Sequence, residues 1–369
     1  MRGEIQGSSR APRGEPGVGS GRRRARRRAV VDALVYLLGW SALGLAASEN
    51  PVRHAPMRFG DESRLGRPFA KDPSVLRIGD QYRLYFSLPP WASNRAPPGA
   101  PSGWSIGIAE SHDLIQWRKV AELQPEQPCE QRGICAPGAR WIGGRIYLVY
   151  QTYGNGPRDA LCLAFSKDGL SFQRHPQNPV FRPQGRWTVG RAIDGELIEF
   201  RGKLWLYFAT RDPTTTTQMV GVAVADPNSD LGPSAWTLAQ DGPVLAPELP
   251  WERRCIEAPS VIVRNGKLYM FYAGGYNNEP QQIGVAVSDD GIHWRRLSDK
   301  PFLPNGAPGD WNASESGHPG ILEDHDGRTY LFFQGNADRG RTWWLSWIEL
   351  DWRDTGPVLL PYRNTPRAP

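Results

Sequence analysis

"RNGKLYMFYA", residues 264–273, places a tight turn directly before a strand that is dense in aromatic side chains. Asn-Gly readily supplies the positive φ angles that a two-residue hairpin turn requires. Four other segments repeat this order of turn and aromatic strand: IGDQYRLYFS (78–87), IGGRIYLVYQ (142–151), FRGKLWLYFA (200–209) and HDGRTYLFFQ (325–334). Successive equivalent aromatic residues are 64, 58, 64 and 61 positions apart, and they are Phe86, Tyr150, Phe208, Tyr272 and Phe333. This regular spacing indicates a repeated structural unit.

Each repeat holds more strands than this one hairpin. A short apolar strand precedes the turn, and a third strand leads to a Ser/Asp turn and a further aromatic, as in AESHDLIQW (109–117), AFSKDGLSF (164–172) and AVSDDGIHW (286–294). Four strands per unit are typical of a propeller blade, so residues 51–355 predict an all-β, five-bladed β-propeller. A β-sandwich is the alternative, but its strands do not repeat one pattern in the same order.

Two features should hold the blades together. The repeated aromatics Trp117, Trp236 and Trp294 are expected to pack between sheets. The last aromatic strand, WWLSWIEL (343–350), is expected to pair near the start of the domain, which removes exposed sheet edges. Residues 356–369 then form a C-terminal tail.

The N-terminal region differs from the rest of the chain. Residues 1–28 contain nine arginines and are expected to form a disordered basic leader, while residues 29–47 are apolar except for Asp32. This layout predicts a signal-peptide core or a membrane anchor, and both would place the domain outside the cytoplasm. A disordered arm with a hydrophobic tail is the alternative.

Charge and cysteine content limit the partners. The net charge is +6, but the first 50 residues carry +5 of it, so the remaining 319 residues carry +1. Such a balanced body gives no support for a nucleic-acid partner, and we expect a monomer. Cys129 and Cys135 would close a small loop as a disulfide or remain free, and their spacing fits no zinc site.

The first strand of each blade lines the channel of a propeller, so the residues that lead these strands should converge. They are Asp72 in KDPSV, Cys135 and Ala136 in ICAPG, Asp194 in AIDGEL, Glu257 in IEAPSV and His318 in SGHPGIL. Carboxylates gathered in a confined opening raise each other's pKa and disfavour folding, which indicates a functional site. Glu257 precedes its aromatic by 15 residues, whereas Asp72 and Asp194 precede theirs by 14, so Glu257 should project differently.

The order KDPSV, CAPG, IDGELI, EAPSVI and GHPGILEDHDG resembles glycoside hydrolase family 43 and its five-bladed relatives, over residues 60–350. That resemblance implies an enzyme that hydrolyses arabinose, xylose or related glycosides by inversion. It makes Asp72 the general base, Glu257 the general acid, and Asp194 the residue that orients the acid and adjusts its pKa. Inversion needs an acid for the leaving oxygen and a base for water on the opposite face of the sugar.

The resemblance also bears on ligands. No cofactor is required, a structural Ca²⁺ in the central channel is allowed, and His318 would help to hold that ion or its water shell, unless it is a structural histidine. An oligo- or polysaccharide substrate also needs apolar surfaces, and the loop residues expected to supply substrate contacts are Trp91, Trp141, Trp187, Arg191, Trp251 and Trp311.

Three departures from the family pattern stand out. Cys135 stands where many relatives have tryptophan. At Asp194 the chain reads IDGE (193–196), where the family more usually has Asp-Pro. The segment TRDP (210–213) is interpreted as a loop away from the centre.

Three other functions stay open at this stage. Phosphorolysis or glycosyl transfer on the same fold would need pocket cations for phosphate, for which Lys71 and Arg191 are candidates. A non-catalytic carbohydrate-binding propeller would not need converging acids. A sialidase would explain the Asp-box-like turn SDDGIHW (288–294), although no clear arginine triad accompanies it.

Overall fold

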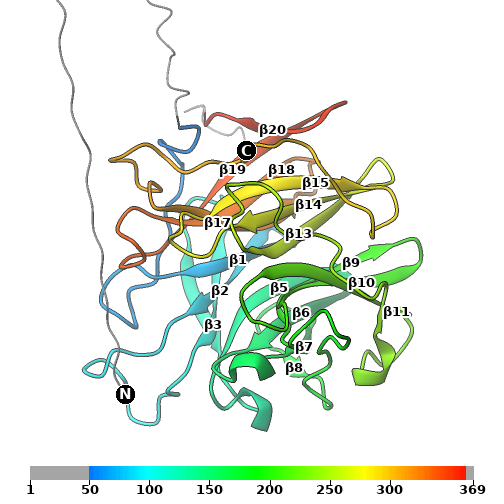
Figure 1. Ribbon diagram of the computed structural model, residues 1–369. Helices are drawn as coiled ribbons and strands as arrows, with labels where there is room; N and C mark the ends of the chain where they lie inside the picture. Colours follow the sequence, from blue (N-terminus) through cyan, green and yellow to red (C-terminus); the bar gives the residue numbers. More distant parts are fainter. Residues whose placement is uncertain (1–49, 363–369) are drawn as a thin grey trace, which may run out of the picture. The chain divides into compact units, whose positions relative to one another are not determined.

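The computed structural model describes residues 50–362, and the regular structure of this part is almost entirely β. Five four-stranded sheets follow one another in chain order (Figure 1). The leader (1–28) and the apolar segment (29–47) lie outside the described residues. Within residues 50–362, no helix combines the length and apolar character needed to cross a membrane.

Each sheet is a meander of consecutive antiparallel strands. The first contains β1 (Lys71–Ile78), β2 (Gln81–Leu88), β3 (Ser105–Ser111) and β4 (Arg118–Leu123). The second contains β5 (Ile134–Ile142), β6 (Arg145–Thr152), β7 (Leu161–Ser166) and β8 (Gln173–Arg174). The third contains β9 (Ile193–Phe200), β10 (Lys203–Arg211), β11 (Gln218–Ala225) and β12 (Thr237–Leu238). The fourth contains β13 (Ile256–Arg264), β14 (Lys267–Gly274), β15 (Gln282–Ser288) and β16 (Arg295–Arg296). The fifth contains β17 (Glu315–Glu323), β18 (Thr329–Asn336), β19 (Trp344–Arg353) and β20 (Gly356–Leu360).

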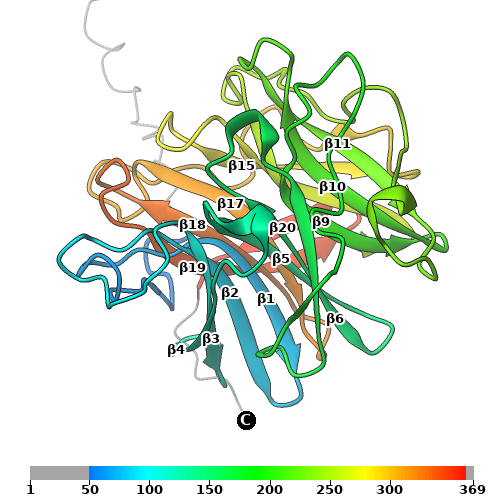
Figure 2. The same ribbon diagram turned by 90° about the horizontal axis from the view of Figure 1, so that it is seen from below.

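The sheets form a closed ring around their first strands. β1 contacts β5, β5 contacts β9, β9 contacts β13, β13 contacts β17, and β17 contacts β1. Figure 2 labels β1, β5, β9 and β17 around the middle of the view. The expected closure is confirmed, because Trp343 and Leu345 form bridges to Phe69 and Phe59 near the start of the domain. This is the five-bladed β-propeller that the repeats predict. The blade extends further than expected, since β20 places Gly356–Leu360 in the fifth sheet and not in a tail.

Every innermost strand is interrupted by a bulge at the same place. The register with the second strand of the sheet shifts there in all five blades. One non-glycine residue at each bulge has a positive φ, and these residues are Asp72 (56°), Ala136 (47°), Asp194 (52°), Ala258 (51°) and His318 (48°). Left-handed backbone costs an L-residue roughly 1–2 kcal/mol, and such strain clusters at functional sites. A bulge also breaks the alternation of side chains, so two consecutive residues can face the same cavity.

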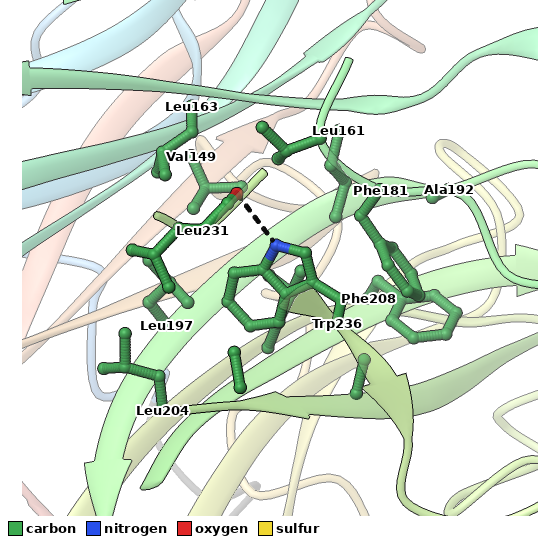
Figure 3. Packing of buried hydrophobic residues seen from close by; sticks show 14 of the residues in the cluster. Val149, Leu161, Leu163, Phe181, Ala192, Leu197, Leu204, Phe208, Leu231 and Trp236 are labelled. Atoms are coloured by element: carbon green, nitrogen blue, oxygen red, sulfur yellow. Dashed lines mark hydrogen bonds between the residues drawn. The ribbon is translucent and has the colours of Figure 1, made fainter. Parts of the chain in front are cut away.

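Five hydrophobic cores fill the spaces between neighbouring blades. Figure 3 shows the core between the second and third sheets, in which Trp236 lies among Val149, Leu161, Leu197 and Phe208. The indole Nε1 donates a hydrogen bond to the carbonyl of Leu231 at 3.2 Å. The expected packing of the repeated tryptophans is confirmed, because Trp117 and Trp294 pack in two of the other cores.

Replacing Trp236 should weaken the junction between these blades. We expect Trp236→Ala to lower the free energy of unfolding by about 3–5 kcal/mol, because it leaves a large cavity in a packed core. Trp236→Phe keeps part of the ring and should cost less. Urea denaturation followed by circular dichroism measures both, and an alanine variant as stable as wild type would contradict the packing argument.

The cysteines do not form the small loop considered above. Cys129 lies in a 3₁₀ turn (Pro128–Glu130), and the neighbouring thiol of Cys162 in β7 lowers its pKa. Cys135 begins an innermost strand instead and lines a pocket. All four cysteines are free thiols, so the Cys129–Cys135 disulfide is not found.

Candidate active site

A pocket of about 160 Å³ lies where the innermost strands begin. This volume is several times the ~30 Å³ that one water molecule occupies in the liquid. All five blades contribute to it, and the lining includes the expected converging residues Asp72, Cys135, Ala136, Asp194, Glu257 and His318. Asp72, Asp194 and Glu257 are buried, with 7%, 8% and 6% of their surface exposed. The sequence prediction that these side chains share one opening is therefore confirmed.

Asp72 is held as a carboxylate. Burial alone would raise its pKa, but the nearby charges of His318 and Lys71 and a hydrogen bond from Ser87 outweigh burial and lower the pKa below its ordinary 3.8. The His318 Nδ1 lies 3.1 Å from Asp72 Oδ1. A buried, ionised carboxylate of this kind is suited to accept a proton from water.

Asp194, in contrast, tends to keep its proton. Burial is the largest cause that raises its pKa, to about 7, and the negative charges of Glu257 and Asp72 add to it, while His318 and Arg191 oppose the rise. This part of the pocket therefore retains a proton near neutral pH.

Two glutamine side chains fix Glu257. The Nε2 of Gln218 donates to Oε2 of Glu257, and the Nε2 of Gln281 donates to Oε1 at 2.6 Å. Glu257 directly precedes the bulge residue Ala258, whereas Asp72 and Asp194 are themselves bulge residues. The one-residue offset noted in the sequence thus corresponds to a different place on the strand.

Sequence reasoning missed a set of amide and hydroxyl groups that support the bulges. Ser87, Gln151 and Gln334 each follow the aromatic of one blade and accept a hydrogen bond from a bulge N–H of the next blade. The backbone N–H of Asp194 donates to Gln151 at 2.7 Å, and that of Asp72 donates to Gln334 at 3.0 Å. The sequence signal that could have found these residues is a polar side chain directly after the repeated aromatic in three of the blades.

The possible calcium ion in the central channel stays a prediction. Ca²⁺ takes six to eight oxygen ligands. In residues 50–362, no group of three or more His, Cys, Asp or Glu side chains is arranged to hold a metal. His318 contacts Asp72, so it can support that carboxylate.

The tryptophans expected to contact substrate do not line the pocket. Trp187, Trp251 and Trp311 pack on the aromatics Phe208, Tyr272 and Phe333 of their own blades, with ring centroids 6.4, 5.9 and 5.7 Å apart. Trp91 lies under the guanidinium of Arg64. Trp141 lies near the end of β5 that is remote from Cys135. The aromatic lining of this pocket comes from Trp104, Tyr153 and Tyr276.

Two arginines and one lysine line the same pocket. Arg191 is there as expected, together with Lys71. Arg211 corrects the interpretation of TRDP as a loop away from the centre, because it ends β10 and lines the pocket. The cavity therefore combines carboxylates of different proton affinity with three permanent cations and aromatic edges. Such a cavity can protonate one atom of a polar ligand while it deprotonates a water molecule at another.

Comparison with known proteins is consistent with this chemistry. The family model "Glycosyl hydrolases family 43" matches residues 65–356. "Alpha-L-arabinofuranosidase 43" of Humicola insolens is 26% identical over 273 residues, which are 68% of this chain and 53% of that protein. "1,2-beta-oligomannan phosphorylase" of Thermoanaerobacter sp. (strain X514) is 31% identical over 259 residues, which are 67% of this chain and 78% of that protein.

Solved structures show the same fold. A "thermostable family-43 glycoside hydrolase" superposes with a TM-score of 0.62 at 21% identity, over 81% of this chain and 95% of that chain.

A further relative matches only part of the chain. "Xylosidase/arabinosidase" of Bacteroides ovatus is 35% identical over 95 residues, which are 26% of this chain and 26% of that protein. The chain thus spans about half, or less, of the length of these two curated arabinosidase relatives.

Proposed function

Because the chain belongs to glycosyl hydrolases family 43, we propose that it hydrolyses a glycosidic bond in the pocket where the innermost strands begin. One observation carries this proposal. Three carboxylates from three blades share that pocket, and the pKa of Asp72 is lowered while that of Asp194 is raised to about 7. A pair of acids whose pKa values are pushed apart is the arrangement that acid–base hydrolysis needs.

Each carboxylate has its own role in this proposal. Asp72 is the general base that takes a proton from the attacking water. Glu257 is the general acid that gives a proton to the leaving oxygen. Asp194, whose pKa is raised to about 7, keeps its own proton near neutral pH and orients Glu257 as the proton donor. Attack on the face opposite to the leaving group makes the reaction inverting.

We further propose a pentose substrate and export of the enzyme. The named arabinosidase relatives support an arabinose- or xylose-type sugar. The basic leader and the apolar segment at residues 29–47 support export, with membrane anchoring if the segment is not removed. We expect the enzyme to act as a monomer on an oligo- or polysaccharide.

A panel of aryl glycosides tests the reaction class. Purified protein is incubated with aryl α-L-arabinofuranosides, β-D-xylosides and hexosides, each with and without inorganic phosphate. Release of free sugar from a pentoside without phosphate supports the proposal. Binding of sugars by calorimetry with no turnover over days would instead favour a non-catalytic propeller.

The pKa shifts give a prediction for the pH dependence. We expect kcat/KM to fall as pH rises through about 7, because Asp194 then loses its proton and becomes a further negative charge beside the proton donor Glu257. On the acid side, Asp72 stays ionised until the pH falls below 3.8, so no loss from this group is expected at pH 5. In Asp194→Asn, which has no proton to lose there, the limb at about pH 7 should disappear. Initial rates between pH 4 and 9 measure this, and an unshifted limb in the variant would contradict the role of Asp194.

Phosphorolysis is the second candidate. The similarity to "1,2-beta-oligomannan phosphorylase" favours it, and so do three cations in the pocket, where the sequence indicated two. Phosphate would then replace water as the nucleophile. Sugar 1-phosphate formed only when phosphate is present would decide for this candidate.

A further inference from the structure

Two arginine side chains in the pocket are held side by side by one amide. Arg191 Nη1 and Arg211 Nε both donate to Oε1 of Gln218, at 3.4 and 3.0 Å. The other end of that amide, Nε2, donates to Glu257. The two guanidinium groups therefore lie next to Glu257, and all four side chains line the same pocket.

The charge of this arginine pair is offset only in part by its protein neighbours. Among the described residues, Arg191 forms an ion pair with Asp159, at 3.5 Å from its Nε, and its charge also acts on Asp194. Asp159 also accepts a hydrogen bond from the backbone of Asn155 at 2.9 Å. The carboxylate of Asp212 accepts from the backbone of Thr216 and Thr217, and so it stabilises its own loop.

Arg211 is the less satisfied member of the pair. Among the described residues its guanidinium forms no ion pair, and it lies over the ring of Tyr276 with its centre 5.4 Å from the centroid. Two cations that share one amide oxygen repel each other. An oxyanion in the pocket would relieve that repulsion and would match the planar donor groups of arginine.

We propose that Arg191 and Arg211 bind the carboxylate of an acidic sugar residue, as in a uronic acid, on the leaving-group side of the bond that is cleaved. This inference rests on the proposed function, because Glu257 marks the leaving-group side only as the general acid. The substrate is then a pentoside attached to an acidic sugar. The carboxylate fixes the leaving sugar next to the proton donor, which favours productive orientation.

The position of the pair favours a carboxylate over phosphate. A phosphate that acts as the nucleophile in an inverting reaction must approach from the face opposite to the leaving group, on the side of Asp72. The side chains whose charges act on Asp72 are His318 and Lys71, and the Lys71 ammonium lies 4.6 Å from the ring centroid of Trp343. Arg191 and Arg211 are linked through Gln218 to Glu257 instead.

Binding of free acidic and neutral sugars tests the proposal. D-Glucuronate and D-galacturonate are compared with D-glucose and D-galactose by calorimetry, and as inhibitors of aryl pentoside hydrolysis. We expect the wild-type protein to bind at least one acid about 10- to 100-fold more tightly than its neutral counterpart, the range for charge-assisted hydrogen bonds. Raising the salt concentration should reduce that preference.

Variants show which residues cause the preference for acidic over neutral sugars. Arg191→Gln and Arg211→Gln should each remove most of it, while Arg295→Gln, an exposed arginine on β16, should keep it in full. Arg211→Lys retains the charge without the planar fork and should give an intermediate preference. Melting temperatures establish that each variant is folded.

Two results would overturn the proposal. One is equal binding of acidic and neutral sugars by the wild-type protein, and the other is turnover that depends on phosphate. Because calorimetry does not require catalysis, the two claims can fail separately. Preferential uronate binding without hydrolysis refutes the proposed function and the leaving-group assignment but keeps the arginine pair as a carboxylate site. Hydrolysis without uronate preference refutes this inference alone.

Discussion

Asp72→Asn should lower kcat/KM for an aryl pentoside by about 10³- to 10⁴-fold, toward the upper end of what a general base contributes. The variant keeps the shape of the side chain but cannot take a proton from water. Asparagine also tolerates the positive φ of 56° at this bulge, so the strand should keep its conformation. Initial rates with a chromogenic pentoside measure the loss.

The control for this variant lies in the same sheet. Asp80 is exposed in the hairpin between β1 and β2, at the other end of β1, so Asp80→Asn should retain wild-type activity. Asp72→Asn that is folded and still within tenfold of wild-type activity would contradict the assignment of Asp72 as the base. Loss of activity with loss of the fold would call for Asp72→Ser, whose short side chain also cannot act as a base.

The loss of activity in Glu257→Gln should depend on how much the leaving group of the substrate needs a proton. For a poor leaving group, such as a sugar or an alkyl alcohol, we expect a loss of about 10²- to 10⁴-fold, because the acid is gone. For a 2,4-dinitrophenyl glycoside, which leaves without protonation, the loss should be much smaller. Rates with a series of leaving groups of different pKa measure the dependence.

The same series separates Glu257 from Asp194. In Asp194→Asn the loss should depend less on the leaving group, because that residue acts through Glu257. Glu199→Gln, at an exposed position on β9, is the matched control and should behave as wild type. A strong leaving-group dependence in Asp194→Asn together with none in Glu257→Gln would exchange the two roles. The raised pKa of Asp194 makes that outcome worth testing.

Much of the fold could be predicted from sequence because it depends on a repeat. The aromatics Phe86, Tyr150, Phe208, Tyr272 and Phe333 mark the second strand of every blade, and the blade count follows from them. The convergence of Asp72, Asp194 and Glu257 was predictable for the same reason, since equivalent strands in a closed ring begin at the same end. A repeat determines where equivalent residues lie in the fold, and the predicted places of these three residues were correct.

The tryptophans predicted to contact substrate do not line this pocket, and the place of three of them in the repeat explains why. Trp187, Trp251 and Trp311 precede their blade aromatics by 21, 21 and 22 residues, a regular spacing that indicates a structural role. Each ring packs over a strand residue that is glycine and so leaves room for it, as Trp251 does over Gly274. A substrate contact has no reason to recur in every blade.

The contacts between blades were not predictable from one sequence. Gln218 joins Glu257 to the two arginines, although Gln218 lies on β11 and Glu257 on the next blade. Arg211 appeared to end a strand far from the centre, yet the strand runs back toward the pocket. Such contacts depend on how far each sheet is rotated against its neighbour, which the local pattern of residues does not specify.

The product anomer is the most direct test of the central claim that Asp72 and Glu257 cleave a glycosidic bond from opposite faces. An aryl pentoside that the enzyme turns over quickly is followed by proton NMR from the first seconds, without phosphate. The account predicts free sugar whose anomeric configuration is opposite to that of the substrate and which then equilibrates. First-formed sugar with the substrate's own configuration, or no sugar released at all, would contradict it.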